Sequence, residues 1–271
     1  MAEEAQTDEL ITEFYEGEEH IAFEMLTKGQ IHLGYWDEHN ADASFWEGAW
    51  KLTQLMIDQV DVEPGQRFCD LGCGVGGPAV ELIRQKKCLV DGVTLSPYQR
   101  HEAQKRVKEA GLENRASFHV ENALELPFDD TSFDGGWFFE SIFHMGHQEA
   151  LKEAQRVLKP GATIVLTDVA DIGKLSAEDK QEAKDLLNVE YRTLDDYPDM
   201  LRETGFELVM QRDISKHVIA PFGEKFGQAL QANKDAVFDI LKHDQERFDA
   251  FASVTDKFDK VGYVMVKARR L

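Results

Sequence analysis

The sequence predicts an α/β protein whose central sheet is parallel and carries crossover helices on its faces. From Arg67 onward, short β-rich runs alternate with longer helical patterns, and this alternation is typical of parallel sheets. No repeat with a period of 20 to 50 residues and no low-complexity stretch interrupts the 271 residues. We therefore expect a single domain over residues 1–271, long enough to bury a sizeable core.

The expected elements follow from this alternation in chain order. The central part should contain strands at 67–71, 88–94, 116–120, 133–138 and 162–168, with helices at 76–86, 97–111 and 147–158. Pro78 lies in the first turn of the first of these helices, a position that suits proline. The later part should contain a helical stretch at 176–189, a second helix at 195–204, a long helical stretch at 221–252 and strands at 206–213 and 261–268.

Several segments fall outside the central part, residues 61–170. Residues 1–60 predict two or three helices that cover the sheet, and residues 171–194 and 215–259 form two late interruptions before the last strand and C-terminus at 261–271. Segments inserted there would lie over the carboxyl edge of the sheet, where open α/β folds bind ligands. Whether this cover is a mobile lid or a fixed helical layer stays open.

The charge balance limits the classes of molecule that this chain is expected to bind. The chain has 51 acidic and 30 basic side chains, a formal net charge of −21, which disfavours nucleic acid. Acids such as Glu16–Glu19 and Asp195–Asp196 are typical of solvated helix faces. The longest apolar runs, such as Thr163–Leu166, are too short to span a membrane, and the acidic N-terminus lacks the charge pattern of a signal or transit peptide. These features predict a cytoplasmic protein.

Three cysteines lie close together at Cys69, Cys73 and Cys88. Their spacing is not that of a CxxC pair, and no histidine cluster stands nearby to complete a zinc site. We expect reduced core thiols and no metal site.

The most informative stretch runs from Phe68 to Pro78. A β-rich run ends in Asp70, and glycines follow at 72, 74 and 76, where they allow positive φ and close approach of a ligand to the backbone. A carboxylate in this loop would repel a pyrophosphate at the following helix. The loop therefore favours a cationic or amine-bearing ligand.

The run from Asp70 to Gly76 resembles motif I of class I S-adenosylmethionine-dependent methyltransferases. Within that superfamily the chain is most similar to small-molecule enzymes of the rebeccamycin sugar O-methyltransferase and tocopherol methyltransferase group. The resemblance implies a Rossmann-like, seven-stranded sheet, mostly parallel with an antiparallel last strand, plus a helical cover. Five further stretches carry it: Ile31–Trp36, Gly92–Gln99, Leu126–Asp134, Glu140–Met145 and Arg156–Gly161.

The resemblance implies S-adenosyl-L-methionine as cofactor and residues 61–170 as the part that binds it. Asp70 would help to hold the ammonium of the methionine part, which would lie against Gly72, Cys73, Gly74 and Gly76.

The ribose and adenine contacts follow in the same way. Most methyltransferases have an acid at the end of the second strand, whereas this chain has Thr94-Leu95-Ser96, so that Ser96 and Gln99 would substitute as neutral hydrogen-bonding groups beside Thr94. Asn122 and Ala123 would lie beside the adenine.

The resemblance also places aromatic and acidic residues near the cofactor. Tyr35 and Trp36 would close over the sulfonium, where an aromatic face attracts a cation, although packing of the N-terminal helices would explain them equally simply. Glu140 completes the expected cofactor-binding set.

Methyl transfer requires alignment of the reactants and exclusion of water, and it needs no metal. A hydroxyl acceptor also has to lose its proton, and His144, assisted by Asp168, is the expected general base. The alternatives are structural roles: His144 could bond to a nearby backbone group, and Asp168 could cap a helix or anchor a loop. His147 is expected to start the next helix.

The acceptor should be a small, largely apolar, natural-product-like molecule, with oxygen favoured. Aromatic residues at Trp137–Phe139 and Phe143 keep C-methylation of an isoprenoid or aromatic compound open, although a diphosphate substrate would require arginines or Mg²⁺. N-methylation of a small amine, a catalytically silent binding module and a homodimer also remain open.

Overall fold

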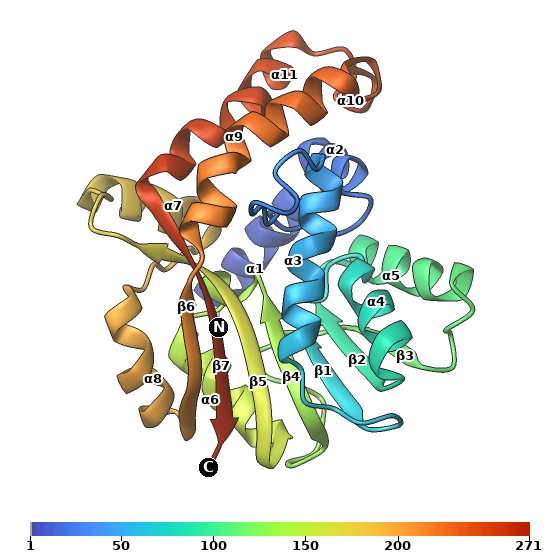
Figure 1. Cartoon of the computed structure of the whole chain (residues 1–271), viewed down its shortest axis with the longest axis vertical. Coiled ribbons are helices and arrows are strands. Elements are labelled where there is room, and N and C mark those ends of the chain that lie inside the picture. The colour runs from blue at the N-terminus through green and yellow to red at the C-terminus, as the bar shows by residue number, and fades with distance from the viewer. Residues whose placement is uncertain (1) are drawn as a thin grey trace.

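The computed structural model describes residues 2–271, with side chains described at 8–255 and 258–271. Within these residues, seven strands form one sheet in the order β3-β2-β1-β4-β5-β7-β6 (Figure 1). Neighbouring strands are parallel except β7, which runs antiparallel to both β5 and β6, so the predicted mostly parallel sheet with an antiparallel last strand is confirmed. The strands are β1 (Arg67–Leu71), β2 (Leu89–Thr94), β3 (Ala116–Val120), β4 (Phe133–Phe139), β5 (Leu158–Asp171), β6 (Phe206–Asp213) and β7 (Val261–Arg270).

Helices cover both faces of this sheet (Figure 1). The ranges from the N-terminus to the middle of the chain are α1 (Ala2–Tyr15), α2 (Glu18–Thr27), α3 (Phe45–Gln59), α4 (Gly77–Lys86), α5 (Pro97–Glu109) and α6 (His147–Val157). The later ones are α7 (Ala177–Leu187), α8 (Tyr197–Glu203), α9 (Ser215–Ala232), α10 (Lys234–Ile240) and α11 (Gln245–Ala252), with short 3₁₀ turns at Ile142–His144, Leu194–Asp196 and Ser253–Lys260.

The core follows from strand alternation, because successive side chains point to opposite faces of a sheet. On one face Phe68 and Trp137 pack with apolar residues of α3, α4 and α5. On the other face Cys69, Phe138 and Leu166 pack with α6 and α8. Both faces of the central strands are therefore buried, as expected for parallel strands.

The late helical segment is divided into shorter elements. The expected helical stretch over 221–252 consists of three helices, α9 to α11, of which the first already begins at Ser215, and together they form an arm beyond the sheet (Figure 1). The chain breaks at Asn233 and again at Lys242 and His243, which both adopt positive φ. Asp244 then caps α11 by accepting hydrogen bonds from the backbone N–H groups of the next turn.

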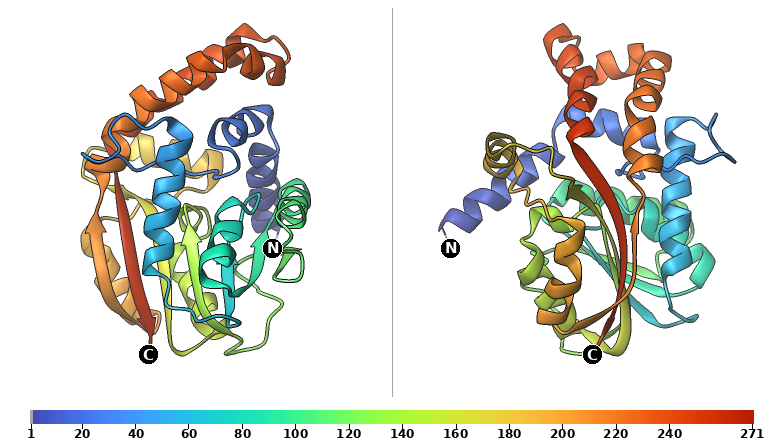
Figure 2. Two further views of the ribbon diagram at one scale, coloured as in Figure 1. Left: turned by 45° about the vertical axis from the view of Figure 1, so that its right-hand side comes forward. Right: turned by 60° about the vertical axis from the view of Figure 1, so that its left-hand side comes forward.

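The N-terminal cover lies beside the carboxyl ends of the strands. Helix α1 packs against α7, and the two views in Figure 2 show both above one end of the sheet. In the described part of the chain, no helix combines the length and apolar character needed to cross a bilayer. Cys69, Cys73 and Cys88 are buried free thiols, as predicted.

Candidate active site

The glycine loop connects β1 to α4 and requires glycine at several positions. Gly72, Gly74 and Gly76 all have positive φ, between 50° and 82°. A Cβ on Gly72 would lie 2.5 Å from Cβ of Ser141, so any side chain there would displace the turn after β4. Because Gly72 and Gly74 carry no side chain, their backbone is open to a ligand in the cavity that both residues line.

This cavity has a volume of about 900 Å³, within the range of small-molecule sites. It lies at the carboxyl ends of β1, β2 and β4, and residues of α1 and α7 complete its lining, as expected for a ligand site in an α/β sheet. We call it the main cavity. Its lining includes Asp8, Ile11, Thr12, Tyr15, Ile31, Gly72, Gly74, Thr94, Ser96, Gln99, Asn122, Ala123, Phe139, Glu140, His144, Met145, Lys184, Asp185 and Asn188.

Asp70, the last but one residue of β1, lies directly below the loop. Its side chain is 2% exposed, and its Oδ2 is buried without a hydrogen-bond partner. Burial raises the pKa of this carboxyl to about 7. A buried acceptor of this kind would be satisfied by a cationic ligand group.

Polar groups after β2 form a connected set at one end of the cavity. Thr94 donates its hydroxyl to Gln99 Oε1 at 2.7 Å, and the Ser96 hydroxyl accepts from the Gln99 backbone N–H at 3.0 Å. The Ser96 hydroxyl also donates to Glu16 at 2.6 Å. Glu16 follows α1, so the N-terminal cover brings a carboxylate to a strand end that has none of its own.

Asn122 lies on the neighbouring strand end, after β3. Its Oδ1 accepts from the Leu124 backbone N–H at 2.8 Å, and its amide Nδ2 donates to Asp8 of α1 at 3.1 Å. Asn122 and Ala123 both line the main cavity. Helix α1 and the residue that follows it thus contact two of the polar positions that face this cavity.

Glu140 follows β4 in a left-handed backbone conformation with φ of 49°. Its Oε1 accepts hydrogen bonds from the Leu33 backbone N–H at 2.9 Å and from the Tyr263 hydroxyl. Burial raises the pKa of Glu140 to about 7. The side chain is therefore held in one orientation at the cavity wall.

His144 lies in the 3₁₀ turn after β4 and is buried at the cavity wall. Its Nδ1 lies 2.7 Å from the Leu187 carbonyl oxygen, which can only accept, so Nδ1 carries the proton. Burial lowers the pKa of His144 to about 4, which keeps the ring neutral. Nε2 is then an acceptor, and it receives the Tyr15 hydroxyl at 2.7 Å.

Comparison with known proteins places this site in a family. A methyltransferase domain model matches residues 69–166. The chain is 36% identical over 195 residues to a (+)-O-methylkolavelool synthase from Herpetosiphon aurantiacus, covering 71% of this chain and 69% of that protein. It is 32% identical over 253 residues to a 27-O-demethylrifamycin SV methyltransferase from Amycolatopsis mediterranei, covering 89% of each.

The chain belongs to the class I S-adenosylmethionine-dependent methyltransferases. Solved structures agree with this assignment. The [4+2]-cyclase SpnF has a TM-score of 0.81 and 27% identity, with 96% of this chain and 95% of that chain covered. A geranyl diphosphate methyltransferase in complex with its diphosphate and sinefungin has a TM-score of 0.75 at 20% identity, covering 98% and 100%, and shows the same fold.

This methyltransferase uses S-adenosylmethionine, and the residues of the main cavity fit it. The cofactor supplies an electrophilic methyl group on a sulfonium sulfur. The orphaned carboxylate oxygen of Asp70, which adjoins the glycine loop but does not itself line the cavity, suits the cofactor's ammonium, and the positive-φ glycines leave room beside it. Ser96 and Asn122 offer a hydroxyl and an amide for the ribose and adenine.

Asp168 of β5 does not lie beside His144. Its Oδ2 accepts from His147 Nε2 and from the Tyr197 hydroxyl, each at 2.6 Å, and all three side chains are fully buried. Asp168 shares the face of β5 that carries Leu166, which packs against α6 and α8, and it does not line the main cavity. His147 starts α6, as predicted, and ties that helix to β5 through Asp168.

Five predicted cofactor residues, Asp70 among them, do not line the main cavity. The Tyr35 ring stacks on His217 at 5.0 Å, and Trp36 is 4% exposed and stacks on Phe45. Cys73 is buried, which raises the pKa of its thiol well above its usual range. Gly76 packs against α5 rather than against the cavity.

The structure adds residues that the sequence analysis missed. The acidic helix α1 contributes Asp8, Thr12 and Tyr15, α7 contributes Lys184, and Asn188 follows at the end of α7. No motif marks either helix, because the positions that face the cavity are set by how each helix packs. The position of the N-terminal segment over the sheet edge was the one available signal.

Proposed function

We propose that this methyltransferase transfers the methyl group of S-adenosylmethionine to a hydroxyl oxygen of an uncharged, natural-product-like small molecule, with His144 as the general base. Cofactor contacts by Asp70, the glycine loop, Ser96, Gln99, Asn122 and Glu140 are part of the same proposal. Assignment to the rebeccamycin and tocopherol methyltransferase group remains a prediction.

The state of His144 carries the proposal. A general base needs a free lone pair that points into the substrate cavity. The Leu187 carbonyl fixes the proton on Nδ1, so the Nε2 lone pair faces the cavity, where the Tyr15 hydroxyl now donates to it. An acceptor hydroxyl in the place of the Tyr15 hydroxyl would meet the same lone pair.

The protein's part in the reaction is alignment and proton transfer. His144 Nε2 takes the proton of the acceptor hydroxyl as the oxygen becomes methylated, and the ring later releases that proton to solvent. Tyr15, Ile11 and Met145 line the cavity around this point, so helix α1 would help to exclude water.

The charge of the cavity wall supports an uncharged acceptor. Five acids line the main cavity, and Lys184 is the one lysine or arginine among the lining residues that the structure describes; the acids are Asp8, Glu121, Glu125, Glu140 and Asp185. A diphosphate would be repelled by this wall. In the described residues there is also no group of three His, Cys, Asp or Glu side chains arranged to hold a metal ion.

The names of relatives support oxygen without deciding it. An O-methyltransferase resE from Aspergillus sclerotiorum is 28% identical over 248 residues, and 24-methylenesterol C-methyltransferase 2 from Arabidopsis thaliana is 32% identical over 198 residues, covering 55% of that enzyme. Carbon is therefore the alternative that the relatives offer.

A second candidate is N-methylation of a small amine. It is favoured by the acids in the cavity wall, since they would attract an ammonium ion. His144 would in that case deprotonate the ammonium before methyl transfer.

The deciding experiment offers the purified protein matched acceptors with S-adenosylmethionine and detects methylated product by mass spectrometry. The set comprises terpenoid and polyketide alcohols, the corresponding amines, an alkene without a heteroatom, and geranyl diphosphate. We expect methyl ethers, with loss of turnover in His144→Ala. Methylation of the alkene or the diphosphate, or full activity of His144→Ala, would refute the proposal, and product from amines alone would establish the second candidate.

A further inference from the structure

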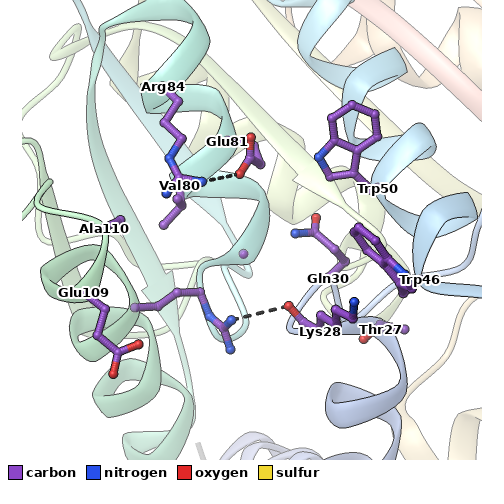
Figure 3. A pocket seen from close by; sticks show the side chains of 12 residues that line it. Thr27, Lys28, Gln30, Trp46, Trp50, Val80, Glu81, Arg84, Glu109 and Ala110 are labelled. Atoms are coloured by element: carbon purple, nitrogen blue, oxygen red, sulfur yellow. Dashed lines mark hydrogen bonds and ion pairs between the residues drawn. The ribbon is translucent and has the colours of Figure 1, made fainter.

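A second cavity of about 370 Å³ lies on the outer side of the molecule, between α3 and the pair α4 and α5 (Figure 3). We call it the α3–α4 groove. None of its lining residues lines the main cavity. The groove backs onto the cofactor loop, because Gln30 and Gly77 line it while Ile31 and Gly74 line the main cavity.

One wall of the groove is aromatic. Trp46 and Trp50 are one turn apart on α3 and stand across the groove from Val80 of α4 (Figure 3). Trp50 is 41% exposed, an unusual position for so large an apolar side chain. Together the two indoles offer flat apolar surface to a planar ligand.

The rest of the lining is mixed in charge, with Lys28, Arg84 and Arg106 against Glu81 and Glu109. Arg84 pairs with Glu81 on the same helix at 2.7 Å (Figure 3). The Arg106 guanidinium bonds to Glu24 at 2.9 Å and to the Lys28 carbonyl oxygen. The Lys28 ammonium lies 3.9 Å from the centroid of the Trp46 ring.

Lys28 interacts electrostatically with Glu47 of α3, whose pKa it helps to lower, but it forms no direct ion pair with an acidic side chain that the structure describes. Its ammonium instead lies on the face of the half-buried Trp46, beside the exposed Trp50, in a chain with a net charge of −21. A cationic ligand is disfavoured, because Lys28 already lies on the Trp46 face.

We propose that the α3–α4 groove binds a flat organic anion, of which an aromatic carboxylate is the simplest example, separately from the methyl-transfer site. The ring would lie along Trp50 and Val80, and the carboxylate would pair with the Lys28 ammonium. Charge-assisted hydrogen bonds of this kind are about twice as strong as neutral ones, so the anion should be preferred over its neutral analogue.

The test is a calorimetric titration of 2-naphthoate into the protein saturated with S-adenosylhomocysteine, which blocks the cofactor site. We expect saturable binding with a dissociation constant below about 1 mM, and binding of the neutral 2-naphthamide at least about tenfold weaker. Absence of saturable naphthoate binding, or equal affinity for the amide, would overturn the proposal.

Two lysines provide a matched pair of variants. Lys28 and Lys87 are both exposed, end a helix with positive φ and accept asparagine without strain. Lys28→Asn should weaken naphthoate binding about tenfold, whereas Lys87→Asn, with the same change in net charge, should leave it unchanged. Equal effects of the two variants would show that naphthoate responds to overall charge or binds elsewhere, against the proposal.

A variant at the aromatic wall tests the other half of the site. Trp50→Leu, at a position that solvent reaches, should weaken naphthoate binding severalfold while the thermal unfolding midpoint stays close to that of the wild type. Unchanged affinity in this folded variant would contradict the placement of the ring. These readouts measure binding alone, so they do not depend on the acceptor or on the base.

Discussion

Replacing Asp70 by asparagine should stabilise the cofactor-free protein and weaken cofactor binding at the same time. The carboxyl is 2% exposed and one of its oxygens lacks a partner, so its charged form is poorly solvated. Asparagine has nearly the same shape and removes the charge. The two effects therefore have one cause and opposite signs.

The magnitude follows from the pKa. Burial raises the pKa of Asp70 from 3.8 to about 7, and each pKa unit corresponds to about 1.4 kcal/mol. Ionisation thus costs the folded state up to roughly 4 kcal/mol above pH 7, a cost that grows as pH rises from about 4 to about 7. Burying the asparagine amide also has a cost, which offsets part of the free energy gained by removing the charge. We therefore expect a net gain of roughly 1–3 kcal/mol in the free energy of unfolding.

The loss of binding is estimated from the charge-assisted hydrogen bond to the cofactor's ammonium. Such bonds contribute roughly 1.5–3 kcal/mol, which corresponds to a loss of affinity of about 10- to 100-fold. Urea unfolding at pH 8 measures the stability, and calorimetry with S-adenosylhomocysteine measures the affinity.

A matched control is Asp134→Asn. Asp134 accepts from the Arg67 backbone N–H and pairs with Lys159 at 2.6 Å, away from the main cavity. This variant should lose a little stability and keep its affinity for the cofactor. The reasoning about Asp70 fails if Asp70→Asn destabilises the cofactor-free protein, or if its affinity stays within a few-fold of the wild type.

Three further predictions concern the base, its supposed assistant and the loop. His144→Ala should lower kcat about 10²- to 10⁴-fold with little change in cofactor affinity. In the wild type, kcat should fall on the acid side with a midpoint near pH 4, because the lowered pKa keeps the His144 ring neutral above that pH. A midpoint near pH 6.5 would contradict the argument that burial lowers the pKa of His144. Asp168→Asn should cost about 3 kcal/mol in urea unfolding, since it disrupts a fully buried hydrogen-bonded cluster. The acid midpoint should move slightly downward, because the Asp168 charge raises the pKa of His144 and the variant removes that charge. A loss of kcat as large as that of His144→Ala would show that Asp168 takes part in the proton transfer. Gly72→Ala should abolish measurable cofactor binding in calorimetry, because its Cβ would lie 2.5 Å from Ser141 Cβ; retained affinity would show that the loop has another role.

Predictions from the sequence succeeded where neighbouring residues set the outcome. The three alternate glycines have the positive φ that their spacing indicated, and Asp70 is buried at the end of β1. The strands of the central sheet also lie close to their expected positions. Such features depend on local backbone preferences and on apolar runs that are visible in a single stretch of chain.

The expected contact between His144 and Asp168 depends on which face of a strand each side chain occupies. Both were expected at the carboxyl edge of the sheet, but alternate residues of a strand face opposite sides. Thr167 of β5 accepts a hydrogen bond from the backbone N–H of Glu140, which lines the cavity, whereas Asp168 faces α6 and bonds to His147. A difference of one position decides which side chain of β5 contacts the cavity wall, and strand limits predicted from sequence do not resolve it.

Composition and periodicity were enough to predict the class of fold, because it rests on short-range patterns, and the glycine loop supplied the prediction of where a cofactor binds. The contacts that complete the site join distant parts of the chain, such as the Tyr15 hydroxyl on His144, 129 positions apart, and Glu16 on Ser96, 80 positions apart. They exist because α1 packs over the carboxyl edge of the sheet, and the energy of that packing comes from surfaces that meet only in the folded protein.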